Sequence, residues 1–444
     1  MDSVWTKTND LPEFQQLKGE IYADVCVVGG GLAGLLTAYK LTEKGYDVCV
    51  LEAETVCSGA TSMTTAKVTS QHGVIYSKIE DIYGEVASKT YAMANENAIK
   101  EYERIVNSKG IECNWTRIPH TVYSLNGIDE LTVEAASAKK AGINCELIKN
   151  TELPFQVDIA LKFHDQAMFD PYKFVMGILP ELKIFEHSGV NESKASVVST
   201  EKGKVRAKHI VIATHYPFIN TPGWYFTKLH QERSYVIALK NASQLDSMYI
   251  DSSKSGISLR NYEDLLIMGM GDHRTGENPK GGYYDDLINQ AKRLFVGAEV
   301  VNKWSNQDCM TPDMIPFVGK YSKSLPDLYV ITGFNMWGMT NSMVSADIIT
   351  GYITGEEHPA ASLYSGQRFD LGGMGKELTR HNMTSAKCLI EGIAAKEGQP
   401  TCSHLGCKLC RNADDKTWEC PCHGSRFDDE GRVLNGPAQK PFEL

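Results

Sequence analysis

The sequence lacks long apolar runs and lacks clusters of basic residues. No stretch approaches the roughly 20 apolar residues that cross a bilayer, so we expect no membrane span. The formal charge is −10 and no Lys/Arg block is present, which argues against nucleic acid as a partner. The N-terminus, MDSVWTKTNDLPEFQQ, has no basic start followed by an apolar stretch, unlike a secretory signal. We therefore expect a cytoplasmic protein.

The size and composition favour a globular protein of two or three domains. The chain has 444 residues, of which 42% are hydrophobic and 23% are charged. Half of the 12 cysteines lie at or after Cys388. A reducing compartment disfavours a general disulfide framework, so this C-terminal concentration of cysteines needs a chemical reason.

Residues 24–34 read DVCVVGGGLAG and predict a dinucleotide-binding unit. A short apolar strand, Val25 to Val28, runs into a Gly-x-Gly-x-x-Gly turn and a helical pattern. A second apolar strand, Val48 to Leu51, follows and ends at Glu52. The helix N-terminus offers free N–H groups to phosphates, and Glu52 is placed to bind a ribose hydroxyl.

The three glycines have separate expected roles. Gly29 permits the tight turn, Gly31 lets the backbone approach a pyrophosphate, and Gly34 lets the helix pack on the strand. A glycine-rich turn can also serve packing alone. The strand before it, the helix after it and the acid at the right distance favour the nucleotide. The motif does not separate FAD from NAD.

The body of the chain resembles the D-amino-acid-oxidase-like family of FAD-dependent oxidoreductases, which includes glycine oxidase and sarcosine oxidase. The resemblance spans about residues 21–365. It is carried by the glycine-rich unit and by three further segments, which are Ser58 to Lys67 (SGATSMTTAK), Ala207 to Thr214 (AKHIVIAT), and Thr311 to Gly319 with Leu328 to Thr340 (LYVITGFNMWGMT).

The resemblance implies an α/β FAD-binding Rossmann-like domain with an interleaved α+β substrate domain. The FAD-binding pieces would be 21–85, 155–225 and 311–365, and the substrate-domain pieces 86–154 and 226–310. Within the second domain, Asp81 to Gly110 predicts one long helix. The implied FAD contacts are Gly29, Gly31, Leu32, Ala33, Gly34, Glu52, Ala53, Gly59, Ala60, Thr61, Thr65, Ala66, Lys67, Val190, Ala213, Thr214, Gly338, Met339 and Thr340. A helix start at Gly338 would stabilise the negative charge of a reduced flavin.

The substrate-binding residues are harder to predict. Amino-acid oxidases of this family hold the substrate carboxylate with an Arg in the segment that corresponds to 333–338. This chain has Met336 and Trp337 there and no Arg, which argues against simple transfer of that activity. Arg260 could replace it from the substrate-domain sheet, or it could be an ordinary exposed strand residue.

Two further side chains lie where the chain should pass beside the flavin, and Cys57 precedes that segment. Lys67 and His72 could assist hydride removal or proton transfer as catalytic residues. Alternatively, Lys67 faces solvent and His72 caps a turn with Gly73. Cys57 could form a covalent flavin link, although an ordinary loop cysteine is the simpler interpretation.

After Gly366 the composition changes, and residues 366–400 predict a linker. Two loops follow, Thr401 to Cys407 (TCSHLGC) and Cys420 to Ser425 (CPCHGS). They closely resemble the paired loops of Rieske proteins. The resemblance implies a small all-β Rieske domain at 401–444, whose 2Fe–2S cluster has the metal ligands Cys402, His404, Cys420 and His423.

Two other loop cysteines and a later proline also match the Rieske pattern. Cys407 and Cys422 occupy the positions that form a loop-to-loop disulfide in one branch of the family, and Pro437 matches the loop that covers the cluster. Zinc is the alternative metal, although C-x-H paired with C-x-x-H is unusual for zinc. Cys410 has no predicted role.

Two departures from the Rieske pattern matter. Many high-potential members have a Tyr two residues after the loop Ser, where this chain has Phe427. A lost hydrogen bond to sulfur lowers the potential, so we expect a potential below that of respiratory Rieske proteins. The segment is also short, so the strands at its base could be missing or supplied by the flavin body.

These features predict an FAD-dependent oxidoreductase that oxidises a small donor, such as an amine, and exchanges electrons with the Rieske cluster. A flavin takes two electrons and releases them singly, which suits a one-electron cluster. One alternative is an NAD(P)H-fed reductase, which is weakened because no second nucleotide cradle follows Gly34. Another is a non-catalytic redox sensor or electron-transfer module with an exposed histidine edge as its partner surface. The sequence does not name the redox partner.

Overall fold

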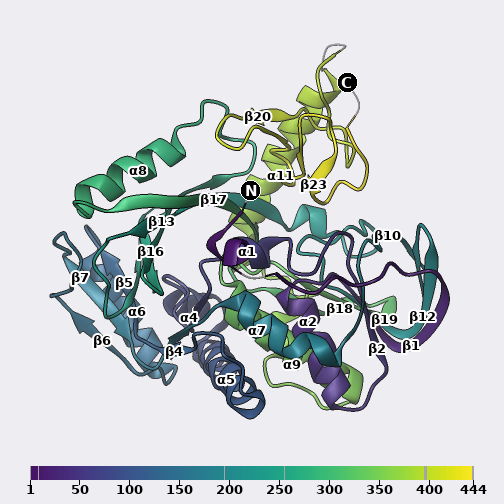
Figure 1. The fold of residues 1–444 in the computed structure, drawn as a ribbon, viewed down its shortest axis with the longest axis horizontal. Helices are drawn as coiled ribbons and strands as arrows, with labels where there is room; N and C mark the ends of the chain where they lie inside the picture. The colour runs from purple at the N-terminus through teal and green to yellow at the C-terminus, as the bar shows by residue number, and fades with distance from the viewer. Residues whose placement is uncertain (1, 9, 195, 255, 395–397, 443–444) are drawn as a thin grey trace.

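The computed structural model describes residues 2–8, 10–194, 196–254, 256–394 and 398–442. Two sheets of eight strands form the body, and a third sheet of four strands forms a separate unit at the C-terminus (Figure 1). Among the described residues, no helix combines the length and apolar character that crossing a bilayer requires.

The first sheet contains the glycine-rich unit. Its central strands pair in parallel, and β2 is buried along its whole length, as expected for a strand covered on both faces. Helices α2 and α9 pack against one another beside it. The strand order is β10-β11-β12-β1-β2-β9, with β19 pairing to β12 and β18 to β19. The bounds are β1 Gly19–Val28, β2 Val48–Leu51, β9 Lys183–Phe185, β10 Val190–Lys194, β11 Val197–Thr200, β12 Gly203–Ile212, β18 Phe317–Ser322, β19 Leu325–Thr332, α2 Leu32–Glu43, α3 Ala60–Met63, α7 Pro171–Ile178, α9 Gly338–Thr354 and α10 Ala361–Tyr364.

The second sheet has the order β17-β13-β16-β15-β14-β5-β7-β6. Its long strands β13, β16 and β17 are antiparallel, and helix α8 packs on β13 and β16. The predicted helix from Asp81 is interrupted, because Gly84 has a positive φ of 84° and separates α4 from α5. The bounds are α4 Tyr76–Tyr83, α5 Glu85–Lys109, β5 His120–Ser124, α6 Ile128–Lys140, β6 Cys145–Ile148, β7 Ile159–Phe163, β13 His230–Lys240, β14 Met248–Asp251, β15 Ser258–Tyr262, β16 Leu265–Arg274, α8 Tyr283–Leu294 and β17 Glu299–Met310.

The chain passes between the two sheets several times, which is the interleaving expected from the sequence. Strand β7 lies in the stretch 155–225 assigned to the FAD-binding domain, yet it pairs with β5 and β6 in the second sheet. Three short strands, β3 Lys67–Val68, β4 Thr116–Arg117 and β8 Ala167–Met168, form a small sheet where the two large units meet. The N-terminal helix α1, Val4–Thr8, packs on α7.

The C-terminal unit begins with a helix that the sequence analysis did not predict. Residues 366–400 were assigned to a linker, but α11 (Leu371–Ile393) occupies most of that segment. Asp370 caps it, since its carboxylate accepts a hydrogen bond from the Gly373 N–H at 2.6 Å. Four short antiparallel strands follow, β20 Cys410–Asn412, β21 Thr417–Glu419, β22 Arg426–Phe427 and β23 Val433–Asn435.

Candidate functional site

The glycine-rich turn joins β1 to α2 with close backbone contacts. Gly29 has a φ of 112°, and a Cβ there would lie 2.5 Å from the Ala213 carbonyl oxygen. A Cβ at Gly34 would lie 2.0 Å from the Gly29 carbonyl oxygen. The nearest atom to a Cβ at Gly31 is the Thr61 hydroxyl at 3.5 Å. Two glycines therefore serve packing, and the space above Gly31 fits a phosphate at the start of α2.

The remaining predicted FAD contacts surround this turn. The Glu52 carboxylate accepts hydrogen bonds from the Gly30 N–H at 2.6 Å and the Glu54 N–H at 2.9 Å. Burial raises the pKa of Glu52, although these hydrogen bonds act to lower it. The Leu32 N–H donates to the Thr61 hydroxyl at 3.0 Å, which places α3 beside the start of α2. Ala213 follows β12 and donates to the Val28 carbonyl at 2.8 Å.

Buried side chains hold the backbone of the segment expected beneath the flavin ring. The Trp304 and Trp5 indoles donate to the carbonyls of Met63 and Thr64, at 2.9 and 2.8 Å. Neither tryptophan was predicted to have a role. Both come from strands or helices far away in the sequence, so local sequence patterns carry no signal for them.

Arg260 completes this set of backbone contacts. It is 2% exposed, so the interpretation as an exposed strand residue is wrong. Its Nη1 donates to the carbonyls of Thr65 and Ala66 at 2.8 and 2.7 Å, and its guanidinium lies over the Trp5 ring at 5.4 Å. Burial lowers its pKa to about 9. These contacts favour a structural role over binding a substrate carboxylate.

Lys67 is buried, so the alternative that it faces solvent is also wrong. Its Nζ donates to the Tyr249 carbonyl at 2.7 Å and the Ser258 hydroxyl at 2.6 Å. Burial, and then the charge of Arg260, lower its pKa well below the usual value. Burial thus favours the neutral form of this lysine more than that of an exposed one, which suits a group that accepts a proton at a cavity wall.

His72 has both ring nitrogens engaged in hydrogen bonds. Nδ1 lies 2.6 Å from the Tyr91 hydroxyl, and Nε2 lies 2.7 Å from the Thr69 carbonyl and 3.0 Å from the Thr340 hydroxyl. Its ring stacks on Trp337 with centroids 4.9 Å apart. Burial lowers its pKa to about 3. This arrangement favours positioning of the start of α9 over proton transfer.

A cavity of about 120 Å³ lies between these segments and the second sheet. One wall comes from residues 63–67 and 336–339, and the facing wall from strands β13 to β17. The facing wall carries Asp251, Asp272 and Asp308, and no arginine is among the described residues that line the cavity. The sequence analysis missed these acids, because they come from three strands that only the fold brings together.

Two of these acids have strongly shifted pKa values. Burial, and then the neighbouring charge of Glu232, raise the pKa of Asp272 to about 7. Burial, and then the charges of Asp272 and Glu232, raise the pKa of Asp308 to about 7. The Asn306 amide donates to Asp308 at 2.8 Å. The cavity therefore gains negative charge as the pH rises through about 7, which suits a cationic ligand.

The two C-terminal loops bring the four predicted metal ligands together. Cys402 and Cys420 are both buried, and their thiols lie close enough for each to shift the pKa of the other. The His404 and His423 rings have centroids 5.1 Å apart. His404 Nδ1 is buried and has no hydrogen-bond partner among the described residues. A buried ring nitrogen without a partner, on one of two neighbouring histidines in the loops that also carry Cys402 and Cys420, fits a cluster with two Cys and two His ligands.

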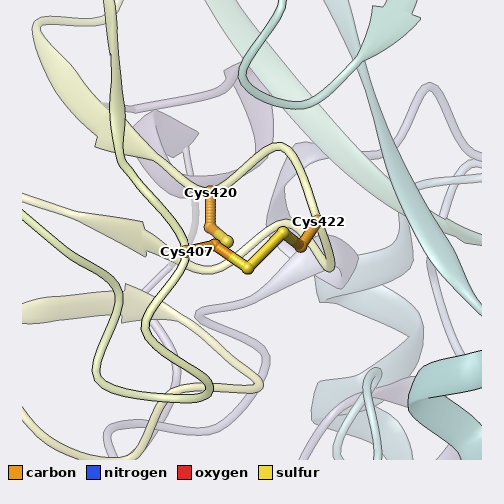
Figure 2. Close-up of side chains that lie close together, drawn as sticks. All are labelled: Cys407, Cys420 and Cys422. Carbon is orange, nitrogen blue, oxygen red and sulfur yellow. A yellow bond between two sulfur atoms is a disulfide. The ribbon is translucent and has the colours of Figure 1, made fainter. Parts of the chain in front are cut away.

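Cys407 and Cys422 form a disulfide that ties the two loops together. Figure 2 shows the Cys420 side chain beside this disulfide, and the three sulfur atoms lie within 4.8 Å of one another. Cys407 and Cys422 are bonded to each other, so of these three only Cys420 keeps a free thiol for a metal. Phe427 is fully buried against Phe442, and Ser425 accepts a hydrogen bond from the Ala438 N–H, next to Pro437, at 3.0 Å.

This fold and these two sites define a flavin-dependent oxidoreductase with an attached iron–sulfur domain. Residues 24–351 match the FAD dependent oxidoreductase family, and residues 393–443 match the Rieske [2Fe-2S] domain. The chain belongs to the FAD dependent oxidoreductase family and carries a C-terminal Rieske domain. Its cofactors are FAD and a 2Fe–2S cluster, so the zinc alternative is set aside.

Known relatives share either the whole architecture or one part of it. The chain is 31% identical to YhfW of Bacillus subtilis (strain 168), named as a Rieske 2Fe-2S iron-sulfur protein, over 100% of this chain and 97% of that protein. It is 28% identical to gamma-glutamylputrescine oxidoreductase of Escherichia coli (strain K12), over 46% of this chain and 52% of that protein. The crystal structure of glycine oxidase from Geobacillus kaustophilus has a TM-score of 0.66 at 16% identity, covering 79% of this chain and 99% of that one, which shows the shared fold.

Proposed function

We propose that this protein oxidises a cationic amine at its FAD and passes the electrons singly to the Rieske cluster of the same chain. The cavity carries the proposal, because it combines the segments expected around the flavin with three carboxylates and no described arginine. A carboxylate-bearing amino acid would be repelled by such a wall, whereas an ammonium group would be attracted. The relative named gamma-glutamylputrescine oxidoreductase supports an amine as donor.

Residues of this chain have distinct parts in the proposed reaction. FAD, when bound, would accept two electrons from the donor C–H bond and release them one at a time. Asp272 and Asp308 would hold the donor cation against the second sheet. Lys67, at the opposite wall, would take a proton, since burial lowers its pKa and favours its neutral form. The start of α9 at Gly338 would stabilise negative charge on the reduced ring.

The two alternatives from the sequence have less support. An NAD(P)H-fed reductase needs a place for a second nucleotide, and the cavity of about 120 Å³ is small for one. A sensor that presents an exposed histidine edge has less support, because His423 is 3% exposed and only His404 is partly exposed.

Anaerobic reduction of the holoenzyme separates these possibilities. Diamines and monoamines should bleach the flavin absorbance, followed by the EPR signal of the reduced cluster. Glycine, proline and NADH should be at least tenfold slower at equal concentration. Bleaching by NADH alone would support the reductase, and failure of every donor, with dithionite still reducing both centres, would support the sensor.

A further inference from the structure

The histidine edge of the C-terminal unit faces the flavin body. The two loops lie against the segment 213–230, which connects the end of β12 to the start of β13 (Figure 1). The Phe226 ring contacts both His404 and His423, with centroids 6.5 and 5.9 Å apart. The same segment begins at Ala213 and Thr214, which are expected FAD contacts.

Asn220 makes the direct polar contact with this edge. His404 Nε2 lies 2.9 Å from Asn220 Oδ1, and Nδ1 of the same ring is buried with no hydrogen-bond partner among the described residues. An amide oxygen can only accept, so the ring hydrogen is on Nε2 and donates to Asn220 Oδ1. Nδ1 then carries the lone pair that could bind a metal. Asn220 is itself held in place, since the Tyr321 hydroxyl donates to the neighbouring Ile219 carbonyl.

The second histidine is enclosed by a matching set of contacts. The Phe226 carbonyl accepts from His381 Nε2 at 2.9 Å, and the His381 and His423 rings have centroids 5.9 Å apart. Arg274 donates to His381 Nδ1 at 3.0 Å and to the carbonyls of Pro421 and Cys422, both at 2.8 Å. The segment 213–230 and α11 therefore bury His423 and leave only His404 partly exposed.

We propose that Asn220 is a positioning residue for the cluster, which fixes the His404 tautomer and lowers the cluster potential, and that the histidine edge is an internal contact with the flavin body. A ligand histidine that donates its outer N–H to an acceptor becomes a more basic ligand. A more basic ligand favours the oxidised iron, so the potential falls. The inference concerns the cluster alone and holds whichever donor reduces the flavin.

The test is an EPR-monitored redox titration of the purified holoenzyme with dithionite, so no donor is needed. Asn220→Asp keeps the size and the acceptor oxygen and adds charge, and it should lower the potential. Asn220→Leu removes the acceptor, and it should raise the potential or prevent cluster assembly. We expect each shift to reach a tenfold change in the reduction equilibrium, which is 59 mV for one electron.

Asn382→Leu is the matched control. Asn382 is an exposed residue of α11 whose amide donates to the Thr227 carbonyl at 3.0 Å, so it meets the same segment and no ligand. The cluster potential and EPR spectrum of Asn382→Leu should equal those of the parent protein. An unchanged or raised potential in Asn220→Asp, or loss of the cluster from that variant, would overturn the proposal. Pulsed EPR should also show altered nitrogen couplings in Asn220→Asp and none in Asn382→Leu.

Discussion

At the scale of single residues, the charge of the cavity depends on two carboxyls. Asp272 and Asp308 have pKa values of about 7 where an ordinary aspartate has 3.8. Their folded-state pKa values lie above the unfolded ones, so each favours the folded state in its protonated form. Stability from these groups is therefore present at low pH and is lost as the pH rises from about 4 to about 7. Ligand binding should respond in the opposite direction, because only the ionised carboxylates attract a cation.

Asp308→Asn is expected to separate these two effects. The variant should bind the cationic donor about tenfold more weakly at pH 8, which corresponds to about 1.4 kcal/mol, and its affinity should change less between pH 6 and pH 8. Its melting temperature at pH 8 should rise, because a buried, repelled charge is removed. Donor titrations and thermal unfolding at both pH values measure this, with the exposed Asp264→Asn as control. A variant that both binds weakly and melts lower would indicate general damage instead.

At the scale of elements, glycines explain both a success and a failure of prediction from sequence. The turn at residues 29–34 is stereotyped, because backbone contacts within one strand–turn–helix unit require each glycine, and β2 begins and ends as predicted. Helix α11 was mistaken for a linker because its glycines suggested flexibility. In the structure a Cβ at Gly373 would lie 2.3 Å from Ile82, and one at Gly392 would lie 2.0 Å from the Gly406 carbonyl oxygen. These glycines allow close packing with elements distant in sequence, and a single sequence does not reveal that.

The same limit explains which site residues were predictable. The Rieske loops and the glycine-rich turn are short motifs, so the ligands that we predict in them follow from local sequence alone. The burial of Arg260 and the pairing of Trp5 with the Thr64 carbonyl depend on tertiary contacts. Strand β7 has an apolar pattern that fits either sheet, so its partners could not be assigned from sequence.

Gly392→Ala should therefore affect the cluster more than the flavin. The added methyl group meets the backbone of the loop between Cys402 and Cys407, and overpacking of this kind costs about 1–3 kcal/mol. We expect lower iron content and weaker cluster absorbance, with FAD content unchanged. Gly375→Ala on the same helix is the matched control, since a Cβ there has nothing within 4 Å, and it should leave both cofactors in place. Equal iron content in the two variants would contradict the close contact with the loop.

At the scale of the whole molecule, a buried charge network joins the C-terminal unit to the second sheet. Arg233 of β13 is fully buried and pairs with Asp415, and its Nε lies 3.6 Å from Glu419. Arg426 lies 3.5 Å from Asp415 and 3.4 Å from Glu419, so two cations face two anions. Gln231 and Gln307 add hydrogen bonds from the same sheet to the carbonyls of the second cluster loop. The C-terminal unit therefore rests on β13 and β17 through side-chain contacts, while its four strands form a sheet of their own.

Arg233→Met should loosen this attachment. Removing one cation leaves Asp415 and Glu419 with Arg426 alone, and breaking a buried ion pair costs about 3–5 kcal/mol. We expect a lower melting temperature, release of the C-terminal unit by limited proteolysis, and slower electron transfer from flavin to cluster, while the FAD-binding unit keeps its cofactor. Lys208→Met removes an exposed pair with Asp24 and should change none of these measurements. If Arg233→Met instead melted and resisted proteolysis like the parent protein, the two units would be held by their hydrogen bonds and apolar contacts, and the charge network would serve orientation rather than stability.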